Sequence, residues 1–237
     1  MKKFALSALL IGVFMFTGCT KNYKTFEEYS DAMEEVRDKL GDYTVETVIS
    51  TPEADINCRT YKKGEKWKTE TSKNNGKTYS DGILYDGKEV YSFSTVNKMA
   101  MSIPFKQMLS KEGANEDNIE MVMKVINPTG ILFYWDLDDL GNKGGDNNSI
   151  SLGKITAKND FKCRMISYKA GGEACISDKY GIAVYLKINT PEKGDIEYNV
   201  KTILNNSLND SDLDLPEGVK KISMADLLQN MAKMFKQ

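Results

Sequence analysis

The sequence contains no histidine among its 237 residues. This absence excludes Ser-His-Asp and Cys-His catalysis, zinc held by histidine, and the commonest proton shuttle near neutral pH. The chain also has no Cys-x-x-Cys pair and no glycine-rich phosphate loop. Its formal charge is only -2, without the basic excess typical of nucleic-acid binding. We therefore expect no enzyme, cofactor or metal site and no nucleic-acid partner, and a function in binding. A hydrolase that uses carboxylates alone is the remaining enzymatic alternative.

The first residues have the pattern of a secretory signal. Lys2 and Lys3 precede an apolar run over residues 5–16, which is too short and too early for a membrane-spanning helix. The run ends in Phe-Thr-Gly-Cys19, which resembles the lipobox of bacterial lipoproteins and implies acylation of Cys19 by diacylglycerol and palmitate. The alternative is an ordinary secretory signal. Removal of residues 1–18 also removes two lysines and takes the formal charge from -2 to -4.

The rest of the chain indicates one β-rich domain. We expect a lipidated N-terminus and short tether over residues 19–24, followed by a single domain over 25–237. Helical spacing of apolar residues predicts helices over 26–40, near 119–126 and from 223 onward. Short β-branched and aromatic runs between turn residues predict strands, in chain order, over 43–50, 55–62, 65–72, 77–85, 88–94, 97–103, 150–156, 161–169, 173–178, 182–189 and 195–203.

Four stretches carry a family resemblance. Residues 61–71 and 82–93 form a charged strand, an Asp-Gly-Lys turn and an aromatic strand, and residues 97–101 form an Asn-Lys hairpin. Residues 213–219 (LDLPEGV) resemble a closing strand. Together with the element order, these stretches resemble the LolA/LolB-like carriers and lipid-binding lipoproteins of bacteria. The resemblance implies an α+β, mostly antiparallel fold: an incomplete, half-open β-barrel with a helical lid over an apolar cavity for acyl chains.

Methionines and aromatic residues are the candidates for the wall of this cavity. Methionine is flexible and polarizable, so a methionine-rich lid over a strand would repack around ligands of varied shape. The alternative is a methionine-rich core without a cavity. The candidate lining residues are Trp67, Phe93, Met99, Met101, Ile103, Met123, Tyr185, Leu227 and Met231.

Three cysteines remain after Cys19. Cys163 and Cys175 flank the turn at Ala170-Gly171-Gly172, so their strands should pair, and we favour a disulfide between them over a bond to Cys58. A tight turn centred on Gly171 would place Cys175 opposite Ser167, so the bond requires a bulge or a different register. Three unbridged thiols are the alternative.

The sequence thus predicts an envelope lipoprotein that binds a lipid or a lipoprotein acyl chain, with envelope lipid or lipoprotein transport as the more specific expectation. It would be anchored in the outer membrane on the periplasmic side, or on the outer face of the cell membrane where there is only one membrane. The alternative is a non-enzymatic interaction or sensor lipoprotein of the same fold that binds a partner protein. An exposed apolar patch over a filled core would favour that alternative.

Overall fold

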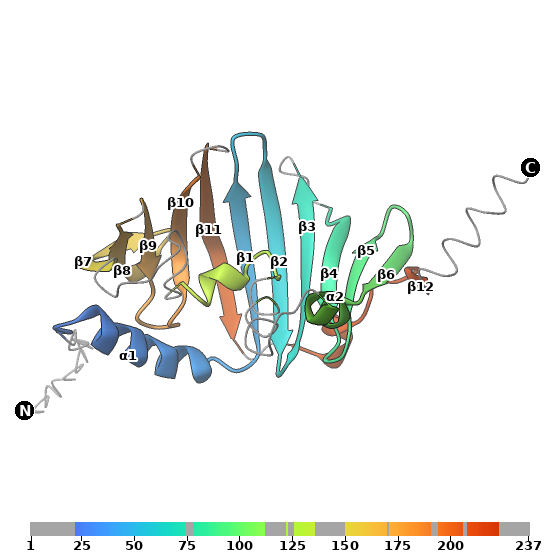
Figure 1. Ribbon diagram of the computed structural model, residues 1–237, viewed down its shortest axis with the longest axis horizontal. Helices are drawn as coiled ribbons and strands as arrows, with labels where there is room; N and C mark the ends of the chain where they lie inside the picture. The colour runs from blue at the N-terminus through green and yellow to red at the C-terminus, as the bar shows by residue number, and fades with distance from the viewer. Residues whose placement is uncertain are drawn as a thin grey trace, which may run out of the picture.

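The computed structural model describes residues 22–73, 78–111, 122, 126–135, 150–169, 171–190, 194–205 and 208–222. These form one twelve-stranded sheet with short helices (Figure 1). In chain order the elements are α1 (Phe26–Asp38), β1 (Tyr43–Ser50), β2 (Asp55–Lys63), β3 (Lys66–Lys73), β4 (Asp81–Tyr85), β5 (Val90–Ser94), β6 (Met99–Ile103), α2 (Phe105–Lys111), η1 (Gly130–Leu132), β7 (Ile150–Lys158), β8 (Phe161–Tyr168), β9 (Gly172–Ile176), β10 (Ala183–Thr190), β11 (Gly194–Asn205), η3 (Asp210–Leu213) and β12 (Lys220–Ile222).

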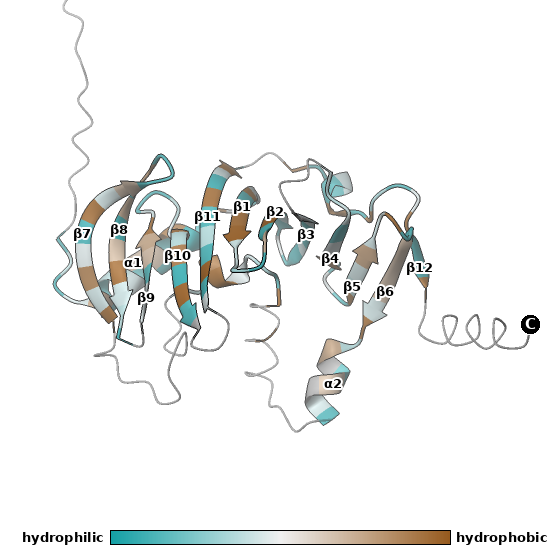
Figure 2. Cartoon of the chain, turned by 90° about the horizontal axis from the view of Figure 1, so that it is seen from above, coloured by the Kyte–Doolittle hydropathy of each residue, from teal (hydrophilic) through white to brown (hydrophobic). Residues whose placement is uncertain are grey.

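Two meanders make up the sheet. Its strand order is β12-β6-β5-β4-β3-β2-β1-β11-β10-β9-β8-β7, so β1 to β6 form one half and β7 to β11 the other. The halves join where β1 pairs antiparallel with β11, and the only parallel pair among the described strands is β12 with β6. Seen from above, the sheet curves strongly at its β7 end (Figure 2). The expected mostly antiparallel α+β class is confirmed by this open sheet.

The main core lies in the β7–β11 half, where α1 and η1 cover one face. We call this the front face, because α1 and η1 lie on it toward the viewer in Figure 1. Thr25 caps α1 by accepting a hydrogen bond from the Glu28 N–H at 3.2 Å, and the helix buries Tyr29 and Met33. Gly181 faces the helix so closely that a Cβ there would lie 2.3 Å from the Met33 carbonyl oxygen. The apolar run over residues 131–135 packs into the same core.

A smaller core lies on the opposite, back face of the other half. Leu84, Tyr91, Phe93 and Ala100 are buried there, and Leu215 and Val219 pack against them. Residues 208–222, which we call the strap, therefore cover the back of β4 to β6. The strap begins with η3, whose Asn209 and Asp212 form a reciprocal capping box. A closing strand was predicted at residues 213–219, but the strand lies at Lys220–Ile222 because a turn from Pro216 to Val219 precedes it.

The predicted disulfide joins Cys163 and Cys175, with 5.4 Å between their Cα atoms. The register differs from the one expected of a turn centred on Gly171: Met165 lies opposite Cys175, and Ser167 lies opposite Glu173. This shift of two residues places Cys163 and Cys175 diagonally across β8 and β9, close enough to form the disulfide. Cys58 is buried as a free thiol.

The helices expected near 119–126 and from 223 onward fall largely outside the described residues, as do Cys19 and the whole of residues 1–21. No described helix has the length and apolarity needed to cross a membrane.

Candidate functional site

Four neighbouring strands each place one apolar residue in a row on the front face. Trp67 of β3 lies opposite Tyr85 of β4, Tyr85 opposite Val90 of β5, and Val90 opposite Ile103 of β6. Trp67 and Val90 are buried, whereas Tyr85 and Ile103 are half-buried. The Trp67 and Tyr85 rings are 6.2 Å apart between centroids. These four residues, which we call the apolar row, form a hydrophobic strip across the sheet.

Strand β6, which lies next to the edge strand β12, continues this strip with methionines. Met101 and Met99 precede Ile103 at alternate positions of the strand, so all three side chains share the front face. Met101 is half-buried, and Met99 is 38% exposed. The neighbouring strand β5 becomes polar along the same direction, where Ser92 and Ser94 lie opposite Met101 and Met99. The methionines therefore extend the strip along β6.

Two predicted lining residues lie elsewhere. Phe93 lies opposite Gly82 and Ala100 on the back face, where a Cβ on Gly82 would come within 2.4 Å of the Phe93 ring. Tyr185 belongs to the β7–β11 half, and the Lys158 ammonium lies 4.2 Å from its ring centroid. Neither residue lies next to Trp67. Tyr185 is in the other half of the sheet. Phe93 points to the opposite face, because side chains alternate along a strand and a one-residue change of register exchanges the faces. Met123, Leu227 and Met231 lie outside the described residues.

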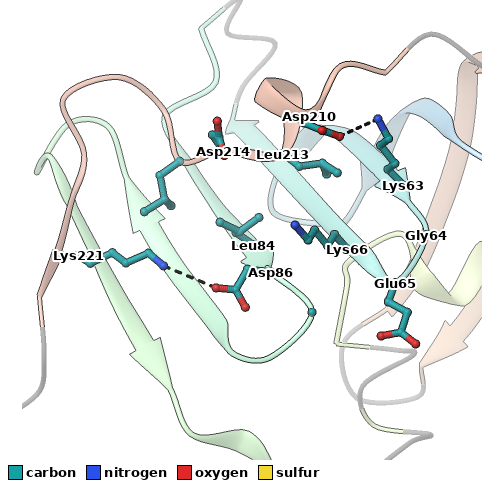
Figure 3. Close-up of a pocket in the computed structure, with 12 residues that line it drawn as sticks. Lys63, Gly64, Glu65, Lys66, Leu84, Asp86, Asp210, Leu213, Asp214 and Lys221 are labelled. Carbon is teal, nitrogen blue, oxygen red and sulfur yellow. Dashed lines mark ion pairs between the residues drawn. The ribbon is translucent and has the colours of Figure 1, made fainter.

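The back face carries an open groove of about 710 Å³ that the sequence did not indicate (Figure 3). It lies between the β2–β3 turn, the β4–β5 turn and the strap. Buried Leu84 and Leu213 form apolar parts of its wall. The full lining is Lys63, Gly64, Glu65, Lys66, Leu84, Asp86, Gly87, Asp210, Leu213, Asp214, Leu215 and Lys221.

Two ion pairs connect the strap to the opposite side of this groove. Lys63 Nζ lies 2.7 Å from Asp210 Oδ1, and Lys221 Nζ lies 3.6 Å from Asp86 Oδ2. Burial opposes ionisation of Asp86, but the backbone N–H groups of Glu89 and Lys88 and the Lys221 ammonium outweigh it and lower the pKa of this carboxyl. The ammonium of Lys221 also lies 3.9 Å from the Tyr91 ring centroid. Both pairs remain solvent-accessible, so each holds the strap only weakly.

Lys66 points into the groove between these pairs (Figure 3). It is exposed and has no carboxylate within salt-bridge distance among the described residues. The groove thus offers an ammonium, carboxylates and leucine side chains together, a combination suited to a charged, extended ligand such as a polypeptide segment. The described residues contain no group of three or more His, Cys, Asp or Glu side chains arranged to hold a metal ion.

The signal that could have revealed the groove is the polar stretch before residue 213. Its Asn-Asp-Ser-Asp sequence contains the N-cap spacing of a short helix, and η3 brings Asp210 to Lys63. Sequence spacing alone does not place this stretch against the β2–β3 turn, since the two are far apart along the chain.

Comparisons with known proteins find a similar fold but no matching family. No family model and no curated sequence matches the chain. An uncharacterised conserved protein of Thermus thermophilus is similar in structure, with a TM-score of 0.52 and 9% identity over 82% of this chain and 99% of that one. This likeness shows a shared fold alone.

Two further solved structures are more distant. MucB in the MucA/MucB complex of Pseudomonas aeruginosa gives a TM-score of 0.47 at 7% identity, over 83% of this chain and 64% of that one. The chain therefore spans less than two thirds of MucB. A LolA superfamily protein of Nitrosomonas europaea gives 0.34 at 9% identity, over 81% and 99%. These two TM-scores are too low to carry an argument about this chain.

Proposed function

We propose that this protein is a non-enzymatic envelope lipoprotein, anchored through acylated Cys19, that binds a lipid or a lipoprotein acyl chain along the apolar row. In this proposal the sheet is an incomplete barrel, with helices as its lid, and serves envelope lipid or lipoprotein transport. The single observation that carries it is the row itself, in which Trp67, Tyr85, Val90 and Ile103 adjoin across four strands. The membrane is the outer one, on its periplasmic side, where the cell has two.

The dimensions and chemistry of the row support this proposal. Three strand spacings of about 4.8 Å give a strip about 14 Å long, which accommodates much of a fatty acyl chain. Each methylene removed from water contributes about 0.8 kcal/mol, so such a contact supplies substantial affinity without hydrogen bonds. Met99 and Met101 extend the strip along β6, and their flexible thioethers adapt to chains of different length.

Native mass spectrometry tests the proposal. The chain from residue 20 onward keeps every described element, since these lie between Phe26 and Ile222. Purified from an envelope-secreting host, it is expected to carry about one extractable acyl species per chain. The Met101→Lys variant, which places an ammonium on the front face, should lose that species. Ser102→Lys is the matched control, because its side chain points to the back face. A protein that carries no co-purified lipid and binds no added phospholipid would contradict the proposal.

A second candidate is the binding of a partner protein in the back-face groove. The observation that favours it is the exposed Lys66 between two ion pairs in an open groove. A photo-crosslinking residue at position 66 would then capture a polypeptide in the native envelope, whereas the same residue at the exposed position 201 on β11 would not. Equal labelling from both positions would argue against a specific partner site.

A further inference from the structure

Positive charge is concentrated in the β7–β8 hairpin, residues 150–169. In a chain of formal charge -2, this hairpin contains five basic side chains and the single acid Asp160. The basic residues are Lys154, Lys158, Lys162, Arg164 and Lys169. Lys154, Lys162 and Lys169 are exposed. The hairpin therefore presents a local excess of positive charge to solvent.

The lysines of the hairpin have no acidic partners among the described residues, as is also true of Lys66 in the groove. Lys63, Lys187 and Lys221 each lie within 3.6 Å of a carboxylate oxygen. In contrast, no carboxylate of the described residues forms an ion pair with Lys154, Lys158, Lys162 or Lys169. Lys158 instead lies over the Tyr185 ring. The fold leaves this charge uncompensated, so an external anion is its natural counterpart.

The hairpin also lies where the chain leaves the membrane anchor. β7 is the edge strand at one end of the sheet, and the N-terminal end of α1 is at the same end of the molecule (Figure 1). The Arg164 guanidinium carbon lies 5.9 Å from the Tyr23 ring centroid. The four residues from Cys19 to Tyr23 span at most about 14 Å, so an acylated Cys19 holds the hairpin close to the bilayer surface.

We propose that the β7–β8 hairpin docks on anionic phospholipid headgroups of the membrane to which the chain is anchored. This inference rests on the lipid anchor of the proposed function. The acidic groups near the hairpin are Asp160 in its turn, Glu173 opposite Ser167 on β9, Asp178 and the carboxylates of α1. Asp178 accepts a hydrogen bond from Tyr29, and α1 carries six acids and one arginine.

Vesicle sedimentation with the unacylated chain, residues 20–237, tests this docking. The probes are vesicles of phosphatidylglycerol mixed with phosphatidylcholine, and of phosphatidylcholine alone. We expect binding to the anionic vesicles only, and its loss at high salt because the Debye length falls to about 3 Å at 1 M ionic strength. The triple variant Lys154→Glu, Lys162→Glu, Lys169→Glu should bind at least about 100-fold more weakly, from roughly fivefold per lysine.

A charge-matched control separates a docking surface from net charge. Lys88, Lys201 and Lys220 are exposed outside the hairpin, so changing all three to Glu alters the net charge equally. This control should keep most of the affinity, with circular dichroism checking both folds. Equal loss in both triple variants, or no binding to anionic vesicles, would overturn the proposal. Saturation of the hairpin by soluble polyglutamate without vesicle binding would assign it to an acidic protein instead.

The vesicle experiment on the hairpin can be distinguished from the test of acyl-chain binding along the apolar row. The probe carries no acyl group, so its binding to anionic vesicles does not depend on the anchor. Binding to pure phosphatidylcholine that Met101→Lys abolishes would report the row rather than the hairpin. A chain that emerges from native mass spectrometry without lipid yet binds anionic vesicles would refute the acyl-binding function and support the docking surface.

Discussion

The buried ammonium of Lys68 donates a hydrogen bond to the backbone carbonyl of Asp214, over a distance of 3.1 Å. Lys68 lies in β3 on the back face, and Asp214 lies in the strap, 146 residues further along the chain. Lys68 also lies 3.4 Å from Glu70 and 5.0 Å from the Tyr61 ring centroid. A charged group with a side chain only 7% exposed needs such partners. This contact is therefore the innermost attachment of the strap.

We predict that Lys68→Met weakens this attachment. Methionine keeps most of the side-chain volume but loses the charge-assisted hydrogen bond, which contributes about 1.5–3 kcal/mol. Urea unfolding should show that loss, and amide hydrogen exchange over residues 213–219 should accelerate. Lys63→Met removes an exposed pair and should cost less than about 1 kcal/mol. Equal costs for the two variants would show that the buried bond has no special role.

The disulfide gives a second prediction. The bond between Cys163 and Cys175 closes a loop of sequence separation 12 in the main core. Replacing both cysteines by alanine should lower the free energy of unfolding by about 3 kcal/mol and Tm by about 10 °C. A reducing agent should destabilise the wild type and leave the double variant unchanged. Cys58→Ala should retain the sensitivity to reductant, because that thiol takes no part in the bond.

Local patterns explain which elements the sequence could predict. Apolar spacing identified α1, and the Asp-Gly-Lys turn at Asp86-Gly87 identified the β4–β5 connection, because these features involve neighbours in the chain. Helix α2 was missed: residues 105–111 directly follow Pro104, and proline is common at a helix start. The pairing of β1 with β11 carries no comparable local signal.

The candidate site could be predicted only in part, because the sequence does not show which face of each strand a side chain occupies. Met99, Met101 and Ile103 were all candidate lining residues, and alternation places them on one face because they lie on one strand. It could not relate them to Phe93 on the next strand, because the register between strands depends on the turn and on packing. The strap posed a further problem, since its contact with Lys68 joins segments with no sequence periodicity in common. Long-range contacts thus determine both candidate surfaces.

Alkaline pH provides a third prediction. Burial raises the pKa of the Cys58 thiol from 9.0 to about 12. The folded state therefore favours the protonated thiol, and this contribution to stability is full below pH 9 and lost as the pH rises toward 12. Between these values Cys58 should account for about 1.4 kcal/mol per pH unit of the decline in unfolding free energy. Urea unfolding at about pH 8.5 and about pH 10.5, on either side of the unfolded-state value, should show a smaller decline for Cys58→Ala. Identical declines would place the thiol in contact with solvent.

Two threonines on neighbouring strands give a final pair of predictions with opposite signs. Thr47 of β1 is 2% exposed, and its hydroxyl has no hydrogen-bond partner among the described residues. Thr60 of β2 is fully buried, and its hydroxyl lies 2.8 Å from that of Thr69 and 2.7 Å from that of Thr129. The same substitution, threonine to valine, removes a hydroxyl from each site with little change of shape.

Thr47→Val should stabilise the protein by about 1 kcal/mol, because an unsatisfied buried hydroxyl costs about 1–3 kcal/mol of desolvation. Thr60→Val should destabilise it by about 1–2 kcal/mol, because Thr69 and Thr129 each lose a partner in a buried network. Both valines suit a strand, so β-propensity does not separate them. Urea midpoints of the two variants should therefore move in opposite directions from the wild type. A loss of stability in Thr47→Val equal to that in Thr60→Val would mean that the Thr47 hydroxyl is hydrogen-bonded in solution, with a buried water as its partner.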